Sequence, residues 1–216
     1  MKRTFGKLPD GKETFLYTIS GGGITVGVSD LGATLVSVYV PDADGNCVDV
    51  ALGYDDAAGY LGGTSFLGAI VGRSANRIKG SAFSLGGRTY ALTPNENANN
   101  LHSGPDFYHT RMWTVTACSD SSISLHLDSS SGDQGYPGNA SIDVTYRLDE
   151  QGGLHITYDA VSDHDTIFNL TNHSYFNLAG QGSTDTAMDQ VLMLPARVFS
   201  VADDQSIPTG EMRSVE

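Results

Sequence analysis

The stretch IDVTYRLDEQGGLHITYDA (residues 142–160) alternates apolar and polar side chains on either side of a short polar break. Strict alternation is typical of a strand with one buried face, and the glycine-containing DEQGG between the halves is typical of a hairpin turn. The apolar side chains of each half share one face: Ile142, Val144, Tyr146 and Leu148 before the turn, and Leu154, Ile156 and Tyr158 after it. The stretch therefore predicts two antiparallel strands that face a core.

The same alternation recurs along the chain. A second hairpin is expected over residues 82–92, where Gly86 and Gly87 supply the positive φ values of a two-residue turn. Only residues 55–61 suit a helical turn, and no linker or repeat divides residues 1–216, so a single domain is expected. Short strands at close spacing predict an all-β fold, a sandwich or a barrel. Further strands are expected at three places: residues 24–28, 32–40 and 122–127.

The composition is that of a globular chain with an acidic surface. The formal net charge is −13 at pH 7, and such a surface repels phosphate backbones and anionic lipids, so neither nucleic acid nor a membrane is expected as a partner. The first residues lack the apolar core of a signal peptide and no stretch is long enough to span a membrane, which predicts a cytoplasmic protein. Cys47 and Cys118 lack a CxxC partner. They are expected to be two buried free thiols, with a disulfide as the alternative, and no metal site is expected.

Four segments depart from the alternation and gather polar groups. They are residues 72–80 (GRSANRIKG), 93–104 (ending in NNLHSG), 132–138 (GDQGYPG) and 169–180 (NLTNHSYFNLAG). Imidazole suits proton transfer at neutral pH, while asparagine amides and arginine forks match the hydroxyls of a sugar. Three rings in these segments are candidates to pack on a pyranose ring: Tyr136, Tyr175 and Phe176. The set indicates a polyhydroxylated substrate and acid–base chemistry.

The chain resembles the aldose 1-epimerases, the galactose mutarotases, in four motifs and in their order and spacing: GRSANRIKG, NNLHSG, GYPGN and NLTNHSYFNLAG. The similarity runs from the N-terminal strands to PTGE at Pro208. The resemblance implies a large antiparallel β-sandwich of the galactose mutarotase type, with the sugar in an open cleft. It also implies the interconversion of α and β anomers of free hexoses such as galactose and glucose, with no metal or organic cofactor and a small aldose as the partner.

The resemblance also implies roles for individual residues. His173 is the expected general acid at the sugar ring oxygen, and His102 is expected to assist by hydrogen-bonding the sugar. Asn76 and Arg77 match positions that bind sugar hydroxyls, and Tyr175 is expected to contact the substrate. The orientation of the His173 imidazole is expected to be held by three neighbours: Asn172, Tyr175 and Asn177.

Other polar residues are expected to have no part in the chemistry. Arg73 is expected to cap a loop carbonyl, and neither Glu96 nor Asp133 is favoured as a catalytic base. The remaining histidines are expected to be bystanders: His109, His126, His155 and His164.

In the family that the chain resembles, the glutamate base and a sugar-binding aspartate follow PTGE. Because the sequence given ends at Glu216, we expect a sandwich that is incomplete at its C-terminus, exposed strand edges, and weak catalysis, since a general base is worth about 10²–10⁴-fold in rate. The alternatives are a sugar-binding module without turnover, an inactive epimerase fragment, and an epimerase acting on hexose 6-phosphates. The charge of −13 disfavours the last of these. The sequence does not indicate an oligomeric state.

Overall fold

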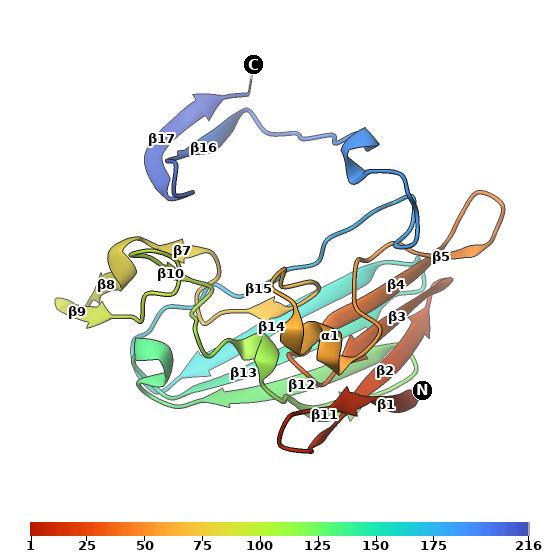
Figure 1. The fold of residues 1–216 in the computed structure, drawn as a ribbon, viewed down its shortest axis with the longest axis horizontal. Helices are drawn as coiled ribbons and strands as arrows, with labels where there is room; N and C mark the ends of the chain where they lie inside the picture. The colour runs from red at the N-terminus through yellow and green to blue at the C-terminus, as the bar shows by residue number, and fades with distance from the viewer. Residues whose placement is uncertain (216) are drawn as a thin grey trace.

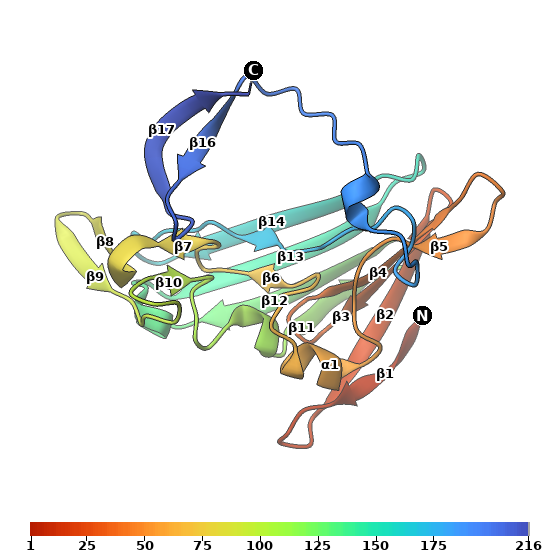
Figure 2. The ribbon, with the colours of Figure 1, turned by 45° about the horizontal axis from the view of Figure 1, so that its top comes forward.

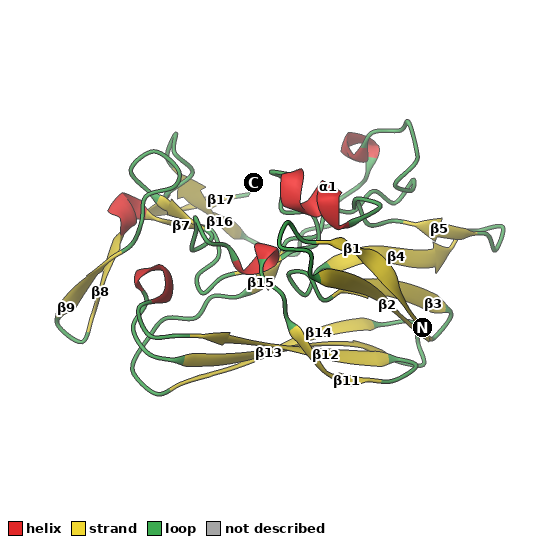
Figure 3. Cartoon of the chain, turned by 60° about the horizontal axis from the view of Figure 1, so that its bottom comes forward, coloured by secondary structure: helices red, strands yellow, loops and turns green. Residues whose placement is uncertain are grey.

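The computed structural model describes residues 1–215 and is built on two antiparallel sheets (Figure 1). The first sheet holds five strands in chain order: β1 (Lys2–Lys7), β2 (Glu13–Gly21), β3 (Ile24–Ser29), β4 (Leu35–Pro41) and β5 (Cys47–Asp49). The second holds four: β11 (Thr114–Cys118), β12 (Ser122–Ser129), β13 (Ala140–Leu148) and β14 (Leu154–Ser162). Figure 3 shows the two sheets as stacked layers, which is the β-sandwich that the alternation and the resemblance predicted.

The hairpin expected from residues 142–160 is β13–β14, and its alternation matches its burial. Along β13, every second side chain is buried, and Val144 pairs with Tyr158 across the ladder. These side chains and those of the first sheet form one apolar core between the layers. Tyr146, fully buried, donates its hydroxyl to the carbonyl of Ala33 at 2.6 Å and thereby ties β13 to the loop before β4.

The remaining ladders of the body are short, and two of them join segments that are not neighbours in the chain. These pairs are β6 (Ile70–Val71) with β15 (Thr171–Asn172), β7 (Arg77–Ile78) with β10 (Asn100–Leu101), and β8 (Ala82–Leu85) with β9 (Arg88–Ala91). The last is the hairpin expected at residues 82–92. Short 3₁₀ turns complete the chain: η1 (Lys79–Ser81), η2 (Tyr108–Thr110), η3 (Asp133–Gly135) and η4 (Ala187–Asp189).

The helical turn expected at residues 55–61 is α1 (Ala57–Gly62). It begins there because the carboxylate of Asp56 accepts the backbone N–H of Gly59 at 3.0 Å, which satisfies an N-terminal donor that the helix itself leaves free. Ala57 and Tyr60 are buried against residues of the first sheet on the face opposite the main core. The helix therefore covers only one end of that outer face.

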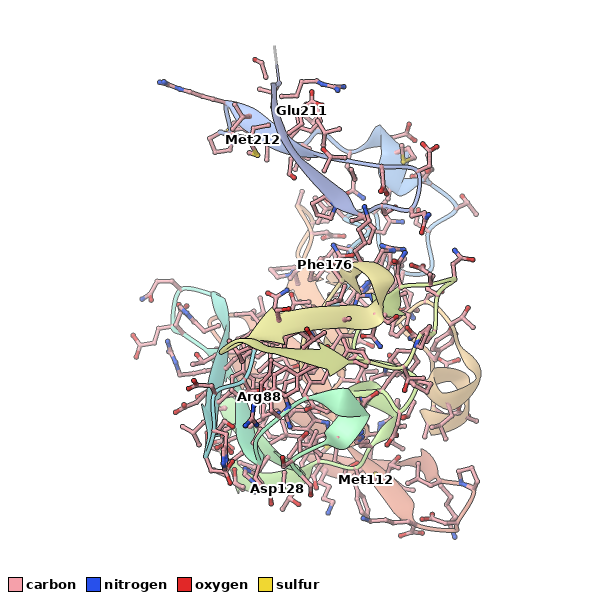
Figure 4. The ribbon with its side chains drawn as sticks, turned by 90° about the vertical axis from the view of Figure 1, so that its left-hand side faces the viewer. Arg88, Met112, Asp128, Phe176, Glu211 and Met212 are labelled. Atoms are coloured by element: carbon pink, nitrogen blue, oxygen red, sulfur yellow. The ribbon has the colours of Figure 1, made fainter. Side chains whose placement is uncertain are left out.

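The C-terminal hairpin, β16 (Val198–Ala202) and β17 (Pro208–Ser214), extends away from the two sheets (Figure 2). Figure 4 places Glu211 and Met212 on this hairpin, at the opposite end of the molecule from Asp128. Its turn meets the body where the amide of Asn99 donates to Gln205 at 2.8 Å. Much of the apolar surface of this region is exposed: Val191, Leu192, Met193, Leu194, Val198, Phe199 and Met212.

The prediction for the cysteines was wrong in one respect. Cys47 and Cys118 are free thiols, as expected, but both are exposed rather than buried. The reason is their position, because Cys47 begins β5 and Cys118 ends β11, and both strands lie at the edges of their sheets. In the part of the chain that the structure describes, no helix is long and apolar enough to cross a membrane.

Candidate active site

The short ladders bring three of the four polar segments to one cavity of about 490 Å³. All five residues singled out as catalytic or substrate-binding line it: Asn76, Arg77, His102, His173 and Tyr175. Ala75, Leu101 and Thr171 of the same segments also line it, together with residues 64–66, which lie outside the four segments. Residues that are far apart in the sequence thus share one concave surface.

His102 is held rigidly by the backbone of Asn76. Its N–H donates to the Asn76 carbonyl at 2.9 Å, and its ring Nδ1 accepts the Asn76 N–H at 3.0 Å. Because Nδ1 is an acceptor, the neutral ring carries its proton on Nε2. The residue is 8% exposed, and burial, followed by the nearby His173, Arg77 and His109, lowers the pKa of His102 to about 4. His102 is therefore a neutral hydrogen-bond donor at physiological pH.

His173 follows β15 and is fixed through its backbone. Its N–H donates to the carbonyl of Ala69 at 2.8 Å, and its own carbonyl accepts from Gly68 at 3.3 Å. Its ring meets His102 edge to face, with centroids 5.2 Å apart and planes at 87°. Tyr175 packs on the ring at 5.2 Å, as expected of a holder.

The expectation that asparagines orient His173 was wrong. The amide of Asn172 donates to the carbonyl of Gly68 at 2.9 Å, and its oxygen accepts from Ser174. Asn177 is buried and bonds to Asp185 and Gln190 instead. Both side-chain amides instead donate to backbone carbonyls of loops, which need a hydrogen-bond partner when they are buried. The ring of His173 is held by packing against neighbouring aromatic rings.

Phe66, which sequence reasoning missed, is the centre of that packing. Its ring lies 4.8 Å from the ring of His102, 5.7 Å from that of His173 and 4.9 Å from that of His109. It sits in the left-handed region, with φ 55°, which an aromatic residue rarely adopts. No local pattern in the sequence marks it, because its importance arises only from what the ladders place around it.

His109 was expected to be a bystander, yet it lies behind Phe66, next to the cavity. Burial, followed by the charge of His173, lowers the pKa of His109 to about 4. Its Nδ1 is buried and has no hydrogen-bond partner among residues 1–215. His109 does not line the cavity, so its contact with the site runs through the ring of Phe66.

Arg77 is anchored at the cavity by Glu96. The guanidinium makes a two-point ion pair with that carboxylate and donates to the Asn76 side chain at 3.2 Å. Hydrogen bonding to Arg77 lowers the pKa of Glu96. Glu96 is thus occupied by Arg77, and Asp133 is likewise bound by Arg111 at 2.7 Å. Neither carboxylate lines the cavity.

Arg73 and Tyr136 are buried in the protein interior, away from the cavity lining. Arg73 is 1% exposed and donates to the carbonyls of Pro137, at 2.8 Å, and Ser129, at 3.2 Å, as expected of a loop cap. The expectation that Tyr136 faces a sugar was wrong: its ring is fully buried, and its hydroxyl accepts a hydrogen bond from the hydroxyl of Ser103 at 2.9 Å.

Phe176 also lies outside the cavity. Its backbone forms a bridge with Ala51, beside the first sheet. Since successive side chains of an extended segment point in opposite directions, the neighbour Tyr175 reaches the cavity and Phe176 does not.

The cavity combines donors, imidazoles and aromatic faces. His102 offers an N–H, Arg77 and Asn76 offer further N–H groups, and Phe66 and Tyr175 supply apolar surface. Among the described residues that line it there is no carboxylate. This inventory suits a neutral ligand that is rich in hydroxyl groups.

Comparisons with known proteins agree with this geometry. The family model described as aldose 1-epimerase matches residues 16–216. The chain is 38% identical to the galactose mutarotase of Bos taurus over 216 residues, which is all of this chain and 62% of the relative. It is 37% identical to the aldose 1-epimerase of Escherichia coli K12 over 208 residues, 96% of this chain and 60% of the relative. The chain thus spans about three fifths of the length of these curated relatives.

Two solved structures share the fold. A homologue of GalM and aldose epimerases from C. elegans superposes with a TM-score of 0.86 at 36% identity, covering 94% of this chain and 62% of that one. The galactose 1-epimerase of Lactobacillus acidophilus gives a TM-score of 0.84 at 30% identity, covering 100% of this chain and 63% of that one. The two-sheet architecture described above is therefore that of galactose mutarotase-like proteins.

Proposed function

Because this chain belongs to the aldose 1-epimerase family, we propose that its cavity binds a free aldose such as galactose or glucose. We further propose that the protein interconverts the α and β anomers of this sugar. The observation that carries the proposal is the convergence of His102, His173, Asn76, Arg77 and Tyr175 on one cavity. Anomer exchange opens the ring, rotates the C1–C2 bond and closes the ring on the other face of the carbonyl. The opening step needs a base for the C1 hydroxyl proton and an acid for the ring oxygen.

In this proposal, His173 delivers the proton to the ring oxygen. Its imidazole lies at the cavity wall between the rings of His102 and Tyr175, and an imidazole exchanges protons readily near neutral pH. His102 stays neutral because its pKa is lowered to about 4, so its Nε2–H donates a hydrogen bond to a sugar oxygen without adding a second positive charge beside His173.

Asn76, Arg77 and Tyr175 hold the sugar. Arg77 is fixed by Glu96 and Asn76 before any ligand arrives, and such preorganisation reduces the entropy lost on binding. The exposed ring of Tyr175 lies beside His173 and supplies an apolar face to the sugar ring. These residues position C1 and the ring oxygen; His173 carries the proton.

A neutral sugar is favoured over a hexose 6-phosphate. Arg77 is the one lysine or arginine among the described residues that line the cavity, and its guanidinium is already paired with Glu96. A phosphate group calls for unpaired cations or several backbone donors. We therefore assign the cavity to an unphosphorylated aldose.

A second candidate function is sugar binding without turnover. The observation that favours it is the lack of a carboxylate among the described residues that line the cavity. By resemblance, the base of the family is a glutamate that follows the PTGE segment, so the catalytic proposal includes a base from outside the described residues. The two candidates share the binding residues and differ only in the proton acceptor at the C1 hydroxyl.

Polarimetry of freshly dissolved α-D-galactose or α-D-glucose distinguishes them. The catalytic proposal predicts equilibration faster than in buffer, and a return to the buffer rate in His173→Ala. A rate equal to that of buffer, accompanied by sugar-dependent NMR shifts at Arg77 and His173, would support the binding module instead. If neither turnover nor binding occurs in a folded sample, both assignments of this cavity are wrong for this chain.

A further inference from the structure

A second cavity, of about 240 Å³, lies on the outer face of the first sheet. It spans β1 to β5 beside the end that α1 covers, and none of the residues that line it lines the cavity of His173. The opposite face of these strands forms the main core. This hollow is therefore a separate feature of the molecule.

The hollow centres on Gly27 and Ser37, which pair across β3 and β4. A Cβ atom on Gly27 would lie 2.5 Å from the hydroxyl of Ser37, so the absence of a side chain opens the space. Ser37 is 8% exposed, and its hydroxyl has no hydrogen-bond partner within residues 1–215. The hydroxyl lines the hollow, so it is free to donate to and accept from a ligand that enters.

One wall holds an acceptor and a donor in fixed positions. The Oδ1 atom of Asp49 accepts from the backbone of Val38 at 2.9 Å and of Ala51 at 3.2 Å, which leaves Oδ2 without a protein partner. The Oε1 atom of Gln181 accepts from Gly53 at 2.7 Å, which leaves its Nε2 donor unused. An acceptor beside a donor, both held by backbone bonds, matches two neighbouring hydroxyls, each of which donates and accepts.

The rim adds charges of both signs and two aromatic rings. Arg3 and Asp55 are both exposed and line the hollow, yet neither forms an ion pair within the described residues. Tyr39 is 41% exposed, and Tyr54 is held edge-on against Tyr60 with centroids 5.2 Å apart. Aromatic faces next to polar groups suit a ring that is apolar on one side and hydroxylated at its edge.

We propose that this hollow is a second binding site, which takes one neutral sugar unit. The mixed charge of Arg3, Asp49 and Asp55 offers no advantage to a strongly anionic or cationic ligand, and the polar wall disfavours an apolar one. Its volume, about 240 Å³, is below the roughly 300–1,000 Å³ of sites for drug-sized ligands, which suits a single ring. The site binds sugar whether or not the His173 cavity catalyses anomer exchange.

The test is a ¹H–¹⁵N NMR titration of the chain with methyl β-D-galactopyranoside, a glycoside that cannot open its ring, and with free D-galactose. We expect amide shifts at Ser37, Tyr39 and Gln181 with both probes, and we expect them to persist in Arg77→Ala, which impairs the first cavity. Shifts with free galactose only would restrict the ligand to the free sugar and overturn the assignment to a sugar unit in general.

Two variants test the site itself. Gly27→Ala combined with Ser37→Ala adds a methyl group at the base of the hollow and removes the hydroxyl that this methyl would meet, and Asp55→Asn neutralises an exposed rim residue that has no ion pair within residues 1–215. We expect the double variant to lose the shifts of the sheet residues, and we expect Asp55→Asn to raise the dissociation constant of the sugar about fivefold, because it replaces a charged acceptor at the rim with a neutral one. Shifts that are absent from the wild-type sheet residues, or unchanged in both folded variants, would overturn the proposal.

Discussion

The rings of His102 and His173 meet edge to face, with centroids 5.2 Å apart and planes at 87°. The backbone N–H of Asn76 occupies Nδ1 of His102, so that ring cannot turn without losing a hydrogen bond. Two imidazoles at this distance disfavour double protonation, since like charges repel strongly in a partly buried site. The relationship therefore favours the neutral state of His102, whose pKa is lowered to about 4.

The first prediction concerns stability below neutral pH. The pKa of His102 is lowered to about 4 from the ordinary histidine value of 6.5, so between these values the unfolded chain binds a proton that the folded chain does not. The free energy of unfolding should fall as the pH drops from about 6.5 to about 4, by up to about 3 kcal/mol from His102. Urea denaturation across this range measures the slope, and His102→Asn should reduce it, with the contribution of His109 remaining.

NMR titration of the ring protons checks the same prediction directly. His102 and His109 should both titrate near pH 4. A midpoint of about 6.5 for either ring would contradict the buried environment described for it.

The second prediction concerns Phe66. Replacing it with alanine removes the ring that contacts His102, His109 and His173, and we expect a loss of about 2–4 kcal/mol in the free energy of unfolding and weaker galactose binding. Phe66→Leu is the matched control, since it keeps most of the volume but not the aromatic edge. Equal sugar affinity in wild type and Phe66→Ala would show that the ring does not position the imidazoles.

The third prediction separates two nearby arginines. Arg73→Lys should destabilise the protein by about 3 kcal/mol, because the carbonyls of Pro137 and Ser129 lose the guanidinium fork that satisfies them. Arg77→Ala should change stability by about 1 kcal/mol or less, since its ion pair with Glu96 is partly exposed, but should reduce galactose affinity. Thermal denaturation and sugar titration of both variants measure the contrast, and the reverse pattern would refute the assigned roles.

The fourth prediction concerns the thiols. Because Cys47 and Cys118 are free and exposed, both should react with Ellman's reagent in the native protein, without denaturant. Cys47→Ser and Cys118→Ser should each remove one reactive thiol. Reaction that requires unfolding would place the side chains in the interior instead.

The fifth prediction concerns the C-terminal hairpin. Strands β16 and β17 are bonded to each other and meet the body at the Asn99–Gln205 hydrogen bond, whereas β12 and β13 are neighbours in the middle of a sheet. Backbone amides of the hairpin should therefore exchange with deuterium much faster than those of β12 and β13. Gln205→Ala should accelerate exchange in the hairpin turn and leave β13 unchanged, and equal protection of the two regions would contradict the observed packing.

The local elements of this fold could be predicted because alternation is a local property. In a strand with one buried face, every second residue is apolar. The strands expected on this basis within residues 142–160, and the hairpin of β8 and β9, are present in the structure. The polar segments were recognisable for the converse reason, since they broke the alternation. The family resemblance then named the residues that share the first cavity.

What the sequence by itself determined is thus the strands whose alternation is strong, such as β13 and β14, the hairpin turns between them, and the chemical inventory of the site. Only the tertiary structure decided how these parts meet. Strand β6 pairs with β15, and β7 pairs with β10. In the folded chain Phe66 contacts three imidazole rings, Tyr136 is buried, and the amide of Asn172 donates to the carbonyl of Gly68. The physical reason is that such contacts join residues distant along the chain. Their formation depends on closing long loops and burying shared surface, and neither leaves a periodic signature in the neighbouring residues.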